Sequence, residues 1–365
     1  KLIQTVNDSR ISHAQLFLGP EGSGKLALAI AYAQYINCKD RKPDDSCGIC
    51  PSCVKFNQLA HPDLHFLYPI NTTRELKKPV SLDFIRHWRE FLLECEYFPQ
   101  LTAWYEKIGI ERKQGVIRAD DARETIKALG YKSYESEYKI MVIWMVEKIF
   151  HAVAPRFLKI LEEPPDKTLF LLVAEAQDQI ISTILSRTQI VKGPRLDDRA
   201  LYDTVLSKTG CTPEEAKDAI QIAHGNYISG FKYLQDKESY SANIEQFRSW
   251  MLSCKMKKFK ELDKHIGSIG SKTRDELKEF FKYALSVIRN ELLISYQNRD
   301  LVRTGEGESE FLLKLSNFMN PSNIQEFYEA FNNAYYSIER NANASIVLMD
   351  LSLMSVRLLN SDPVK

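Results

Sequence analysis

The feature of this 365-residue sequence that most constrains its fold is a glycine-rich loop between a strand pattern and a helix pattern. Residues 19–25 read Gly-Pro-Glu-Gly-Ser-Gly-Lys, after an apolar run at residues 14–18 and before a helical pattern at residues 26–36. Glycines let backbone N–H groups converge on phosphate oxygens, and the lysine neutralises the outer phosphates. This order predicts a P-loop. The residues expected to bind nucleotide are Gly19, Gly22, Gly24 and Lys25.

Two positions near this loop lack the groups that nucleotide hydrolysis needs. The residue after Lys25, where a P-loop carries a Ser or Thr that coordinates Mg²⁺, is Leu26. The apolar run at residues 139–143 should end in an Asp for Mg²⁺ and a Glu that polarises water, but Trp144 and Met145 follow it. We expect no nucleotide hydrolysis at this loop. Nucleotide binding, although weakened, stays an open alternative.

Four cysteines close together predict a metal site. The chain has seven cysteines, an odd number that does not suggest a disulfide framework, and four of them fall within residues 38–53. Their spacing, Cys-x8-Cys-x2-Cys-x2-Cys, is typical of a tetrahedral Zn²⁺ held by four thiolates, which leaves no open position for catalysis. We therefore expect a structural zinc ion, with four unligated cysteines as the alternative. The predicted ligands are Cys38, Cys47, Cys50 and Cys53.

The pattern of apolar residues divides the chain in two. In the first half, short apolar runs alternate with helical patterns, which predicts a parallel sheet covered by helices on both faces. After about residue 193 helical patterns take over, among them a helix capped by Thr212 and two apolar stripes at residues 277–292 and 324–338. Two Gly and two Glu at residues 304–309 predict a mobile loop. The expected strands are residues 14–18, 64–70, 139–144, 168–174 and 188–192.

One stretch, from about residue 71 to residue 115, interrupts the alternation of strands and helices. It contains two of the four tryptophans, Trp88 and Trp104. Around Trp88 the apolar residues follow the 3.6-residue period of a helix. We interpret this stretch as an insertion packed on the outside of the sheet, with a satellite core of its own.

Composition limits the class of protein. The chain has 49 Lys+Arg against 48 Asp+Glu, a net charge of +1, so it has no overall attraction to nucleic acid or membranes. No apolar run approaches the ~20 residues that a membrane-spanning helix needs, and the first residues do not form a signal peptide. We expect a soluble, cytoplasmic, multi-domain protein without membrane partners.

A P-loop followed by this cysteine spacing in one α/β region resembles the clamp-loader ATPases of bacterial DNA polymerase III. Three further segments are similar to motifs of that family: residues 12–19 (SHAQLFLG), residues 158–165 (LKILEEPP) and residues 183–188 (TILSRT). In the last of these, Thr188 stands where the family has Cys. The resemblance extends from residue 12 to about residue 234, apart from the insertion.

The resemblance implies three domains. The first, residues 1–193, would be an α/β P-loop (AAA+/RecA-like) parallel-sheet domain that includes the zinc module at 38–53 and the insertion at about 71–115. Residues 194–238 would form a small helical lid domain. Residues 239–365 would form an all-α collar domain for oligomerisation, which fits the family by its helical pattern more than by motifs.

Within this family, the delta-prime class is the one in which the ATP site decays while the Ser-Arg motif persists. Leu26, Trp144 and Met145, beside an intact Ser186-Arg187, show that combination. The resemblance implies that Arg187 acts in trans on the γ-phosphate of an adjacent motor subunit, an effect worth ~10³–10⁵ in rate in related systems. Ser186 would support this segment. A surface ion pair is the alternative for Arg187.

The resemblance also implies partners, namely the motor (gamma/tau) and delta subunits, with the sliding clamp and primed DNA reached through the assembly. We therefore expect a scaffold subunit without ATPase activity of its own. The first alternative is an active ATPase motor subunit, gamma/tau-like, of the same clamp loader. The second is a free-standing zinc-bearing nucleic-acid binder, which the near-neutral charge disfavours. Besides the zinc ion, whether ATP or ADP is a bound cofactor stays an open question.

Overall fold

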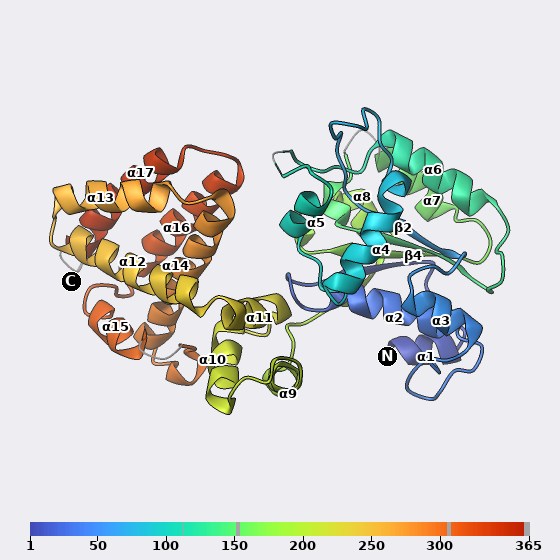
Figure 1. The fold of residues 1–365 in the computed structure, drawn as a ribbon, viewed down its shortest axis with the longest axis horizontal. Helices are drawn as coiled ribbons and strands as arrows, with labels where there is room; N and C mark the ends of the chain where they lie inside the picture. The colour runs from blue at the N-terminus through green and yellow to red at the C-terminus, as the bar shows by residue number, and fades with distance from the viewer. Residues whose placement is uncertain (112, 151–153, 305–307, 361–365) are drawn as a thin grey trace. The chain divides into compact units, whose positions relative to one another are not determined.

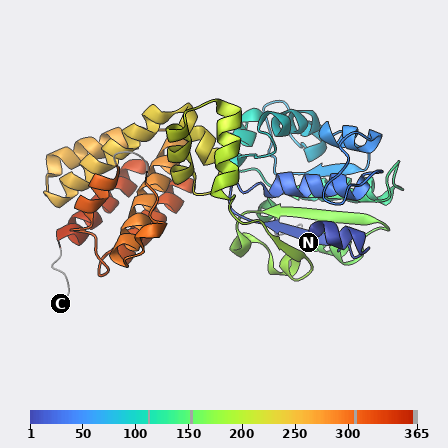
Figure 2. The ribbon, with the colours of Figure 1, turned by 90° about the horizontal axis from the view of Figure 1, so that it is seen from below.

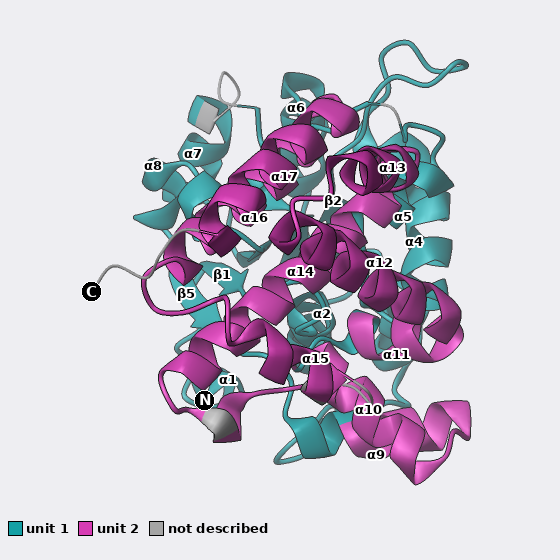
Figure 3. Ribbon diagram, turned by 90° about the vertical axis from the view of Figure 1, so that its left-hand side faces the viewer, with its two compact units in different colours: residues 1–201, 225–228 teal, residues 202–224, 229–365 magenta. Residues whose placement is uncertain are grey.

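The computed structural model describes residues 1–111, 113–150, 154–304 and 308–360 (Figure 1). The chain divides into two compact units, drawn in different colours in Figure 3. Unit 1 comprises Lys1–Leu201 and Gly225–Ile228, and unit 2 comprises Tyr202–His224 and Ser229–Lys365. Residues 305–307 of the predicted loop lie outside the described residues.

Unit 1 contains a five-stranded sheet in which every neighbouring pair of strands is parallel, in the order β2-β3-β4-β1-β5. This confirms the predicted parallel sheet. The second strand is shorter than predicted, since Pro69 has no N–H to donate to a ladder and only an isolated bridge from Ile70 to Val116 continues the pairing. The strands are β1 (Ala14–Leu18), β2 (Leu64–Leu67), β3 (Lys139–Trp144), β4 (Thr168–Ala174) and β5 (Gln189–Lys192).

Helices cover both faces of the sheet because the strands are apolar on both sides. One apolar core joins alternate residues of the strands to helices α1 to α5, and a second core joins the other residues to α6, α7 and α8. In Figure 2 the long helix α2 lies on one side of the strands. The helices are α1 (Leu2–Asn7), α2 (Lys25–Asn37), α3 (Pro51–Asn57), α4 (Ile85–Glu94), α5 (Leu101–Lys107), α6 (Ala119–Gly130), α7 (Ala154–Glu162) and α8 (Ser182–Leu185), with short 3₁₀ turns η1 (Ser81–Phe84), η2 (Val146–Lys148) and η4 (Gln177–Gln179).

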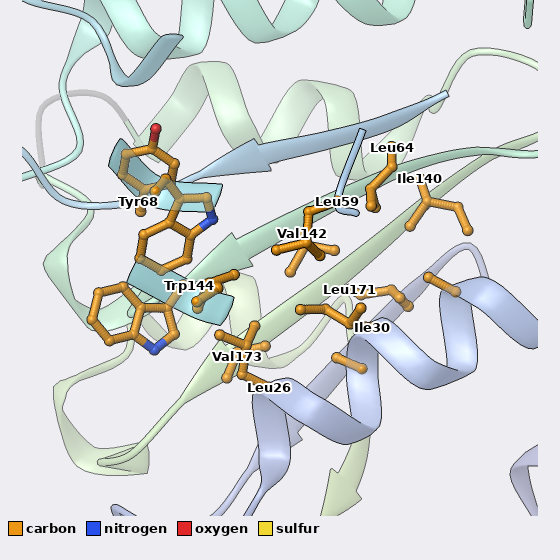
Figure 4. Close-up of a cluster of buried hydrophobic side chains, with 14 of the residues drawn as sticks. Leu26, Ile30, Leu59, Leu64, Tyr68, Ile140, Val142, Trp144, Leu171 and Val173 are labelled. Atoms are coloured by element: carbon orange, nitrogen blue, oxygen red, sulfur yellow. The ribbon is translucent and has the colours of Figure 1, made fainter. Parts of the chain in front are cut away.

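The insertion is part of the main core of unit 1, so the interpretation as a separate satellite core is wrong. Trp88 stacks on Tyr68 with ring centroids 4.3 Å apart, and its ring lies 5.0 Å from the ring of Trp144 at the end of β3. Trp104 meets Trp88 edge to face at 5.0 Å and donates its indole N–H to the carbonyl of Pro69. These rings belong to the same buried cluster as α2 and the strands. Figure 4 labels Tyr68 and Trp144 in this cluster.

The second half of the chain is helical, as predicted. Thr212 and Glu215 form a reciprocal capping box at the start of α10, and the chain leaves that helix through left-handed residues His224 and Gly225. No helix in the described part of the chain has the length and hydropathy needed to cross a membrane. The helices are α9 (Asp198–Thr209), α10 (Pro213–Ala223), α11 (Tyr227–Gln235), α12 (Lys237–Lys255), α13 (Phe259–Gly270), α14 (Arg274–Ser295), α15 (Glu308–Leu315), α16 (Ile324–Glu339) and α17 (Ala344–Asn360), with η5 (Arg299–Leu301).

The two predicted apolar stripes of unit 2 lie on α14 and α16, and most of their residues are buried in one core with α12, α13, α15 and α17. Phe280, Phe281 and Phe331 are fully buried there. Leu292 and Tyr328 are exposed instead. Leu292 is the last residue of its stripe, and Tyr328 lies at the edge of its stripe.

Glu291 on α14 is a buried acid of unit 2, and it gives a prediction for stability against pH. Its carboxylate accepts a hydrogen bond from the Ser316 hydroxyl, and burial raises the pKa of Glu291 to about 7 although that hydrogen bond lowers it. Because the folded pKa lies above the unfolded one, the folded state binds this proton more tightly. The stability that the proton contributes is complete below the unfolded pKa and is lost as the pH rises towards about 7.

We expect Glu291→Gln to raise the free energy of unfolding at pH 8 by on the order of 2 kcal/mol and to change it little at pH 4.5. Denaturant titrations at the two pH values measure this difference. An equal effect of the substitution at both pH values would contradict a buried, titrating Glu291.

Candidate functional site

The glycine-rich loop connects β1 to α2 and is held by close backbone contacts. A Cβ on Gly19 would lie 2.3 Å from the carbonyl oxygen of Gly193, so only glycine fits there. Gly22 and Gly24 have φ of 71° and 73°, a left-handed conformation that favours glycine. The carbonyl of Gly22 accepts a hydrogen bond from the backbone N–H of Tyr227 at 3.1 Å. The loop thus has the glycines a phosphate cradle needs, but one of its carbonyls binds another segment of unit 1.

The lysine of the loop already has an anionic partner. The ammonium of Lys25 lies 2.9 Å from a carboxylate oxygen of Glu175 and also donates to the carbonyl of Pro20 at 3.1 Å. Its side chain is only 6% exposed. Glu175 follows the last residue of β4, the strand next to β1, and this places it at the loop. The positive charge that would attract phosphate is therefore neutralised within the chain.

The three positions expected to lack Mg²⁺ ligands are part of the apolar core. Leu26, Trp144 and Met145 are all buried, in the same cluster as α2 and the insertion. Figure 4 shows Leu26 and Trp144 among the surrounding apolar side chains. These three side chains offer no oxygen atom to a hard cation.

Glu147 is an acid beyond the end of β3, and its role in the structure is to join strand ends. One of its carboxylate oxygens accepts the backbone N–H of Glu175 at 2.9 Å, and the other has no hydrogen-bond partner among the described residues. Burial raises the pKa of Glu147. Its carboxylate therefore lies beside the backbone of Glu175, the partner of Lys25.

Arg187 follows the short helix α8 and is held in a defined position. Its Nε donates to the carboxylate of Glu162 at 2.6 Å, and Nη1 donates to the carbonyl of Thr183 at 3.0 Å. The side chain is 35% exposed. Ser186 donates its hydroxyl to the same carbonyl of Thr183 and accepts from Nη1 of Arg187, so it supports the arginine segment. An exposed guanidinium oriented by a carboxylate can be presented to an anion on another molecule.

The predicted metal ligands are brought together. All four cysteine sulfurs lie within 4.8 Å of one another, and the Sγ atoms of Cys47 and Cys53 are 3.9 Å apart. Two sulfurs bound to one tetrahedral Zn²⁺ at ~2.3 Å would be ~3.8 Å apart. Cys38, Cys47 and Cys53 are buried and Cys50 is half-buried. The four side chains can therefore hold a metal ion.

Backbone N–H groups directed at these sulfurs favour the thiolate form that a metal needs. The N–H of Cys47 donates to Cys38 Sγ, that of Cys50 to Cys47 Sγ and that of Cys53 to Cys50 Sγ, at 3.3 to 3.4 Å. Burial acts to raise the pKa of Cys50, but hydrogen bonds with the backbone of Cys53 and Lys39 and with the side chains of Cys53 and Cys47 outweigh it and lower the pKa to about 6. In the absence of a metal ion, burial and the neighbouring cysteine side chains raise the pKa of Cys53 to about 12, so the charge is concentrated on Cys50. Such donors are typical of the surroundings of thiolate ligands.

Sequence reasoning found the loop, the cysteines and Arg187 but not the groups that they contact. Glu175 could be placed near Lys25 only once the strand order β4-β1 is known. Glu162 lies in a segment that the family resemblance singled out, without any indication that its partner is Arg187. For the contact of Tyr227 with Gly22 of the loop, the sequence contains no local signal.

The parallel five-stranded sheet and the glycine-rich loop between β1 and α2 define a P-loop α/β protein, and a four-cysteine cluster accompanies them. The chain belongs to the family described as "DNA polymerase III, delta subunit", which matches residues 1–197.

The individual relatives carry the names of two kinds of subunit, delta' and gamma/tau. DNA polymerase III subunit delta' of Haemophilus influenzae is 25% identical over 236 residues, which covers 65% of this chain and 59% of that protein. DNA polymerase III subunit delta' of Bacillus subtilis is 25% identical over 207 residues, with 57% of this chain and 50% of that protein covered. DNA polymerase III subunit gamma/tau of Mycobacterium bovis is 27% identical over 219 residues, with 59% and 31% covered. The match spans less than two thirds of each relative's length.

Proposed function

We propose that this chain is a delta-prime-like subunit of a DNA polymerase III clamp loader, without ATPase activity of its own, that supplies Arg187 in trans to an adjacent motor subunit. The observation that carries the proposal is the contrast between two places in unit 1. Leu26, Trp144 and Met145, where Mg²⁺ and its activated water would be held, are core residues. Arg187, in contrast, is oriented and partly exposed.

Arg187 fits a role in trans on physical grounds. Charge develops on the γ-phosphate oxygens during transfer, and a guanidinium held in position stabilises it without reorganisation. Glu162 fixes the guanidinium in the free chain, and a triphosphate on a neighbouring subunit would take its place as the stronger anion. The ion pair with Glu162 also matches the alternative of a purely structural arginine. Turnover of a reconstituted assembly with Arg187→Ala separates the two.

We further propose that the four cysteines hold a structural Zn²⁺. A set of four thiolates leaves no open coordination position, so the ion would stabilise the fold and take no part in chemistry. The segment from Cys38 to Cys53 contains no strand, and its small core consists of the four cysteines themselves. Without a metal ion this segment has little to hold it folded.

The proposed partners follow from the family and the relatives' names. Motor (gamma/tau) and delta subunits would assemble with this chain, and the assembly would carry the sliding clamp and primed DNA. In this proposal residues 1–193 form the AAA+ domain, residues 194–238 the lid and residues 239–365 the collar that joins neighbouring subunits.

An active motor subunit, gamma/tau-like, is the second candidate, because relatives of that name match the chain at 27% identity. It requires a loop that binds and hydrolyses ATP. The ion pair of Lys25 with Glu175 and the buried Leu26 disfavour it.

A further inference from the structure

The turn between α12 and α13 carries an exposed apolar patch in unit 2 (Figure 1). Leu252 and Met256 lie one turn apart on the same face of α12, and Phe259 is the first residue of α13. Each of these three side chains is more than half exposed. Single exposed apolar residues are normal on a protein surface, but three large ones this close together in the chain form a patch.

Lysines accompany these apolar side chains. Residues 255–264 contain five lysines and two acids, in a chain whose overall net charge is only +1. Lys257 and Lys260 are exposed and have no ion-pair partner in the part of the chain that the structure describes, while Lys258 lies 3.1 Å from Glu261. The positive charge at this turn is therefore local, and part of it is available to a partner.

Backbone hydrogen bonds hold the turn that carries Met256 and Lys257. The N–H of Lys257 donates to the carbonyl of Cys254 at 3.2 Å, and the N–H of Lys258 donates to the carbonyl of Ser253 at 3.0 Å, as in a Schellman motif. Lys257 has a φ of 55°, a left-handed conformation in which such motifs usually have glycine. The turn is thus fixed before any partner binds, which lowers the entropic cost of binding.

The lysines do not stabilise the helix that follows them. Lys258 and Lys260 lie at the N-terminal end of α13, where the helix dipole favours acids, and Lys258 makes no side-chain capping hydrogen bond. The exposed ion pair of Lys258 offsets little of this cost. Residues that break a local rule without a gain inside the chain are expected at functional surfaces.

The side chains at this turn suit a protein segment better than nucleic acid. Single-stranded nucleic acid binds by stacking its bases on a row of aromatic rings. Phe318 already has the ammonium of Lys255 over its ring, 4.3 Å from the centroid, so Phe259 is a single further ring and not a row. Leu252 and Met256 instead favour apolar protein side chains, against which flexible aliphatic groups can repack.

We propose that this apolar and basic surface binds an acidic protein segment that carries apolar side chains. The lysine ammonium groups pair with the carboxylates of the segment, and its apolar side chains cover the patch. Because the surface is small, we expect a dissociation constant on the order of 10⁻⁵ M. The proposal does not depend on the function proposed for unit 1. The residues that make the contact are Leu252, Met256, Lys257, Phe259 and Lys260.

Fluorescence anisotropy with the full-length, zinc-loaded chain tests the proposal. The probes are labelled peptides of about twelve residues, made only of Asp, Glu, Leu and Phe in different orders. At least one peptide should bind saturably, and its affinity should fall by roughly tenfold between low and high salt. Peptides with Lys in place of Asp and Glu should not bind. Absence of saturable binding by every acidic peptide up to ~300 µM protein would overturn the proposal.

A charge variant tests the lysines. Lys257→Glu/Lys260→Glu should weaken the best acidic peptide by roughly tenfold or more, because the carboxylates then face like charges. The matched control is Lys127→Glu/Lys132→Glu, which makes the same change of charge at two exposed lysines of unit 1 and should keep the wild-type affinity. Equal weakening in the two double variants would show a general effect of net charge and would contradict binding at this turn.

An apolar variant tests the patch. Met256→Ser/Phe259→Ser should weaken the same peptide by roughly tenfold or more, while Ile346→Ser/Leu353→Ser, at two exposed apolar residues of α17, should not. Wild-type affinity in Met256→Ser/Phe259→Ser would contradict the proposal.

Two other occupants of the surface are tested in parallel. Saturable binding of an oligo(dT) of about 20 nucleotides that is lost in the lysine variant, with no peptide bound, would assign the surface to nucleic acid and overturn the proposal. Self-association of the wild-type chain in sedimentation that is lost in the apolar variant would assign the surface to a second copy of this chain, and it would overturn the proposal as well.

Discussion

Arg187→Ala should lower ATP turnover at the motor site that Arg187 serves by roughly 10³-fold. The guanidinium would stabilise the charge that develops on the transferred phosphoryl group, and alanine offers no replacement for it. The measurement is DNA-stimulated phosphate release by the reconstituted assembly, with single-turnover conditions used to isolate the slow site. Assembly itself should survive, because the side chain is partly exposed and its contacts in the free chain are to Glu162, Thr183 and Ser186.

Two control variants separate a role in trans from a structural one. Arg86→Ala removes another exposed arginine that is paired with a glutamate, Glu90, and should leave turnover unchanged. Arg187→Lys keeps the charge but loses the planar fork, so it should recover only part of the rate. Unchanged DNA-stimulated turnover in Arg187→Ala would mean that Arg187 serves only as the ion-pair partner of Glu162.

Removal of the metal ion is the second change for which we expect a large effect, here on the protease resistance of the cysteine segment. We expect about one Zn²⁺ per purified chain, as a closed four-thiolate site requires. In Cys50→Ser/Cys53→Ser the zinc should be lost and residues 38–53 should become rapidly cleaved by protease. The reason is that zinc binding at structural sites contributes about 10–16 kcal/mol in isolated zinc-finger peptides, and this segment has no other core of its own.

The experiment combines metal analysis with limited proteolysis, with and without a chelator. Cys211→Ser is the matched control because it removes a half-buried cysteine outside the cluster, and it should keep full metal content. Clearly less than one Zn²⁺ per wild-type chain, or equal protease resistance in the double variant, would contradict a structural zinc site.

The central strands could be predicted to within a residue because a strand buried on both faces is a continuous apolar run. The observed β1, β3 and β4 have the predicted bounds, and β5 is one residue shorter. The four-cysteine cluster was predictable because its ligands are local in sequence, and the structure brings all four together. The end of β2 could not be predicted, because the strand pairing there depends on which neighbouring segment lies opposite Pro69.

The contacts that define the site could not be predicted because they join segments distant in sequence. Lys25 meets Glu175 across two adjacent strands, and Phe98 meets Tyr227 across more than a hundred residues. The hydrophobic period and the residue propensities determine which face of a helix or strand is apolar. They do not determine which other part of the chain packs against that face. The insertion shows this most clearly: the period around Trp88 predicted its helix, yet only the fold shows that Trp88 packs on Trp144.

The most direct test of the account is phosphate release by the purified full-length chain with Mg²⁺ and ATP, in the absence of other subunits. We predict a rate equal to that of buffer alone and equal to that of Lys25→Ala. Saturable turnover in the wild type that disappears in Lys25→Ala would show a working ATPase site, and it would contradict both the silent P-loop and the assignment of this chain as a non-hydrolysing subunit.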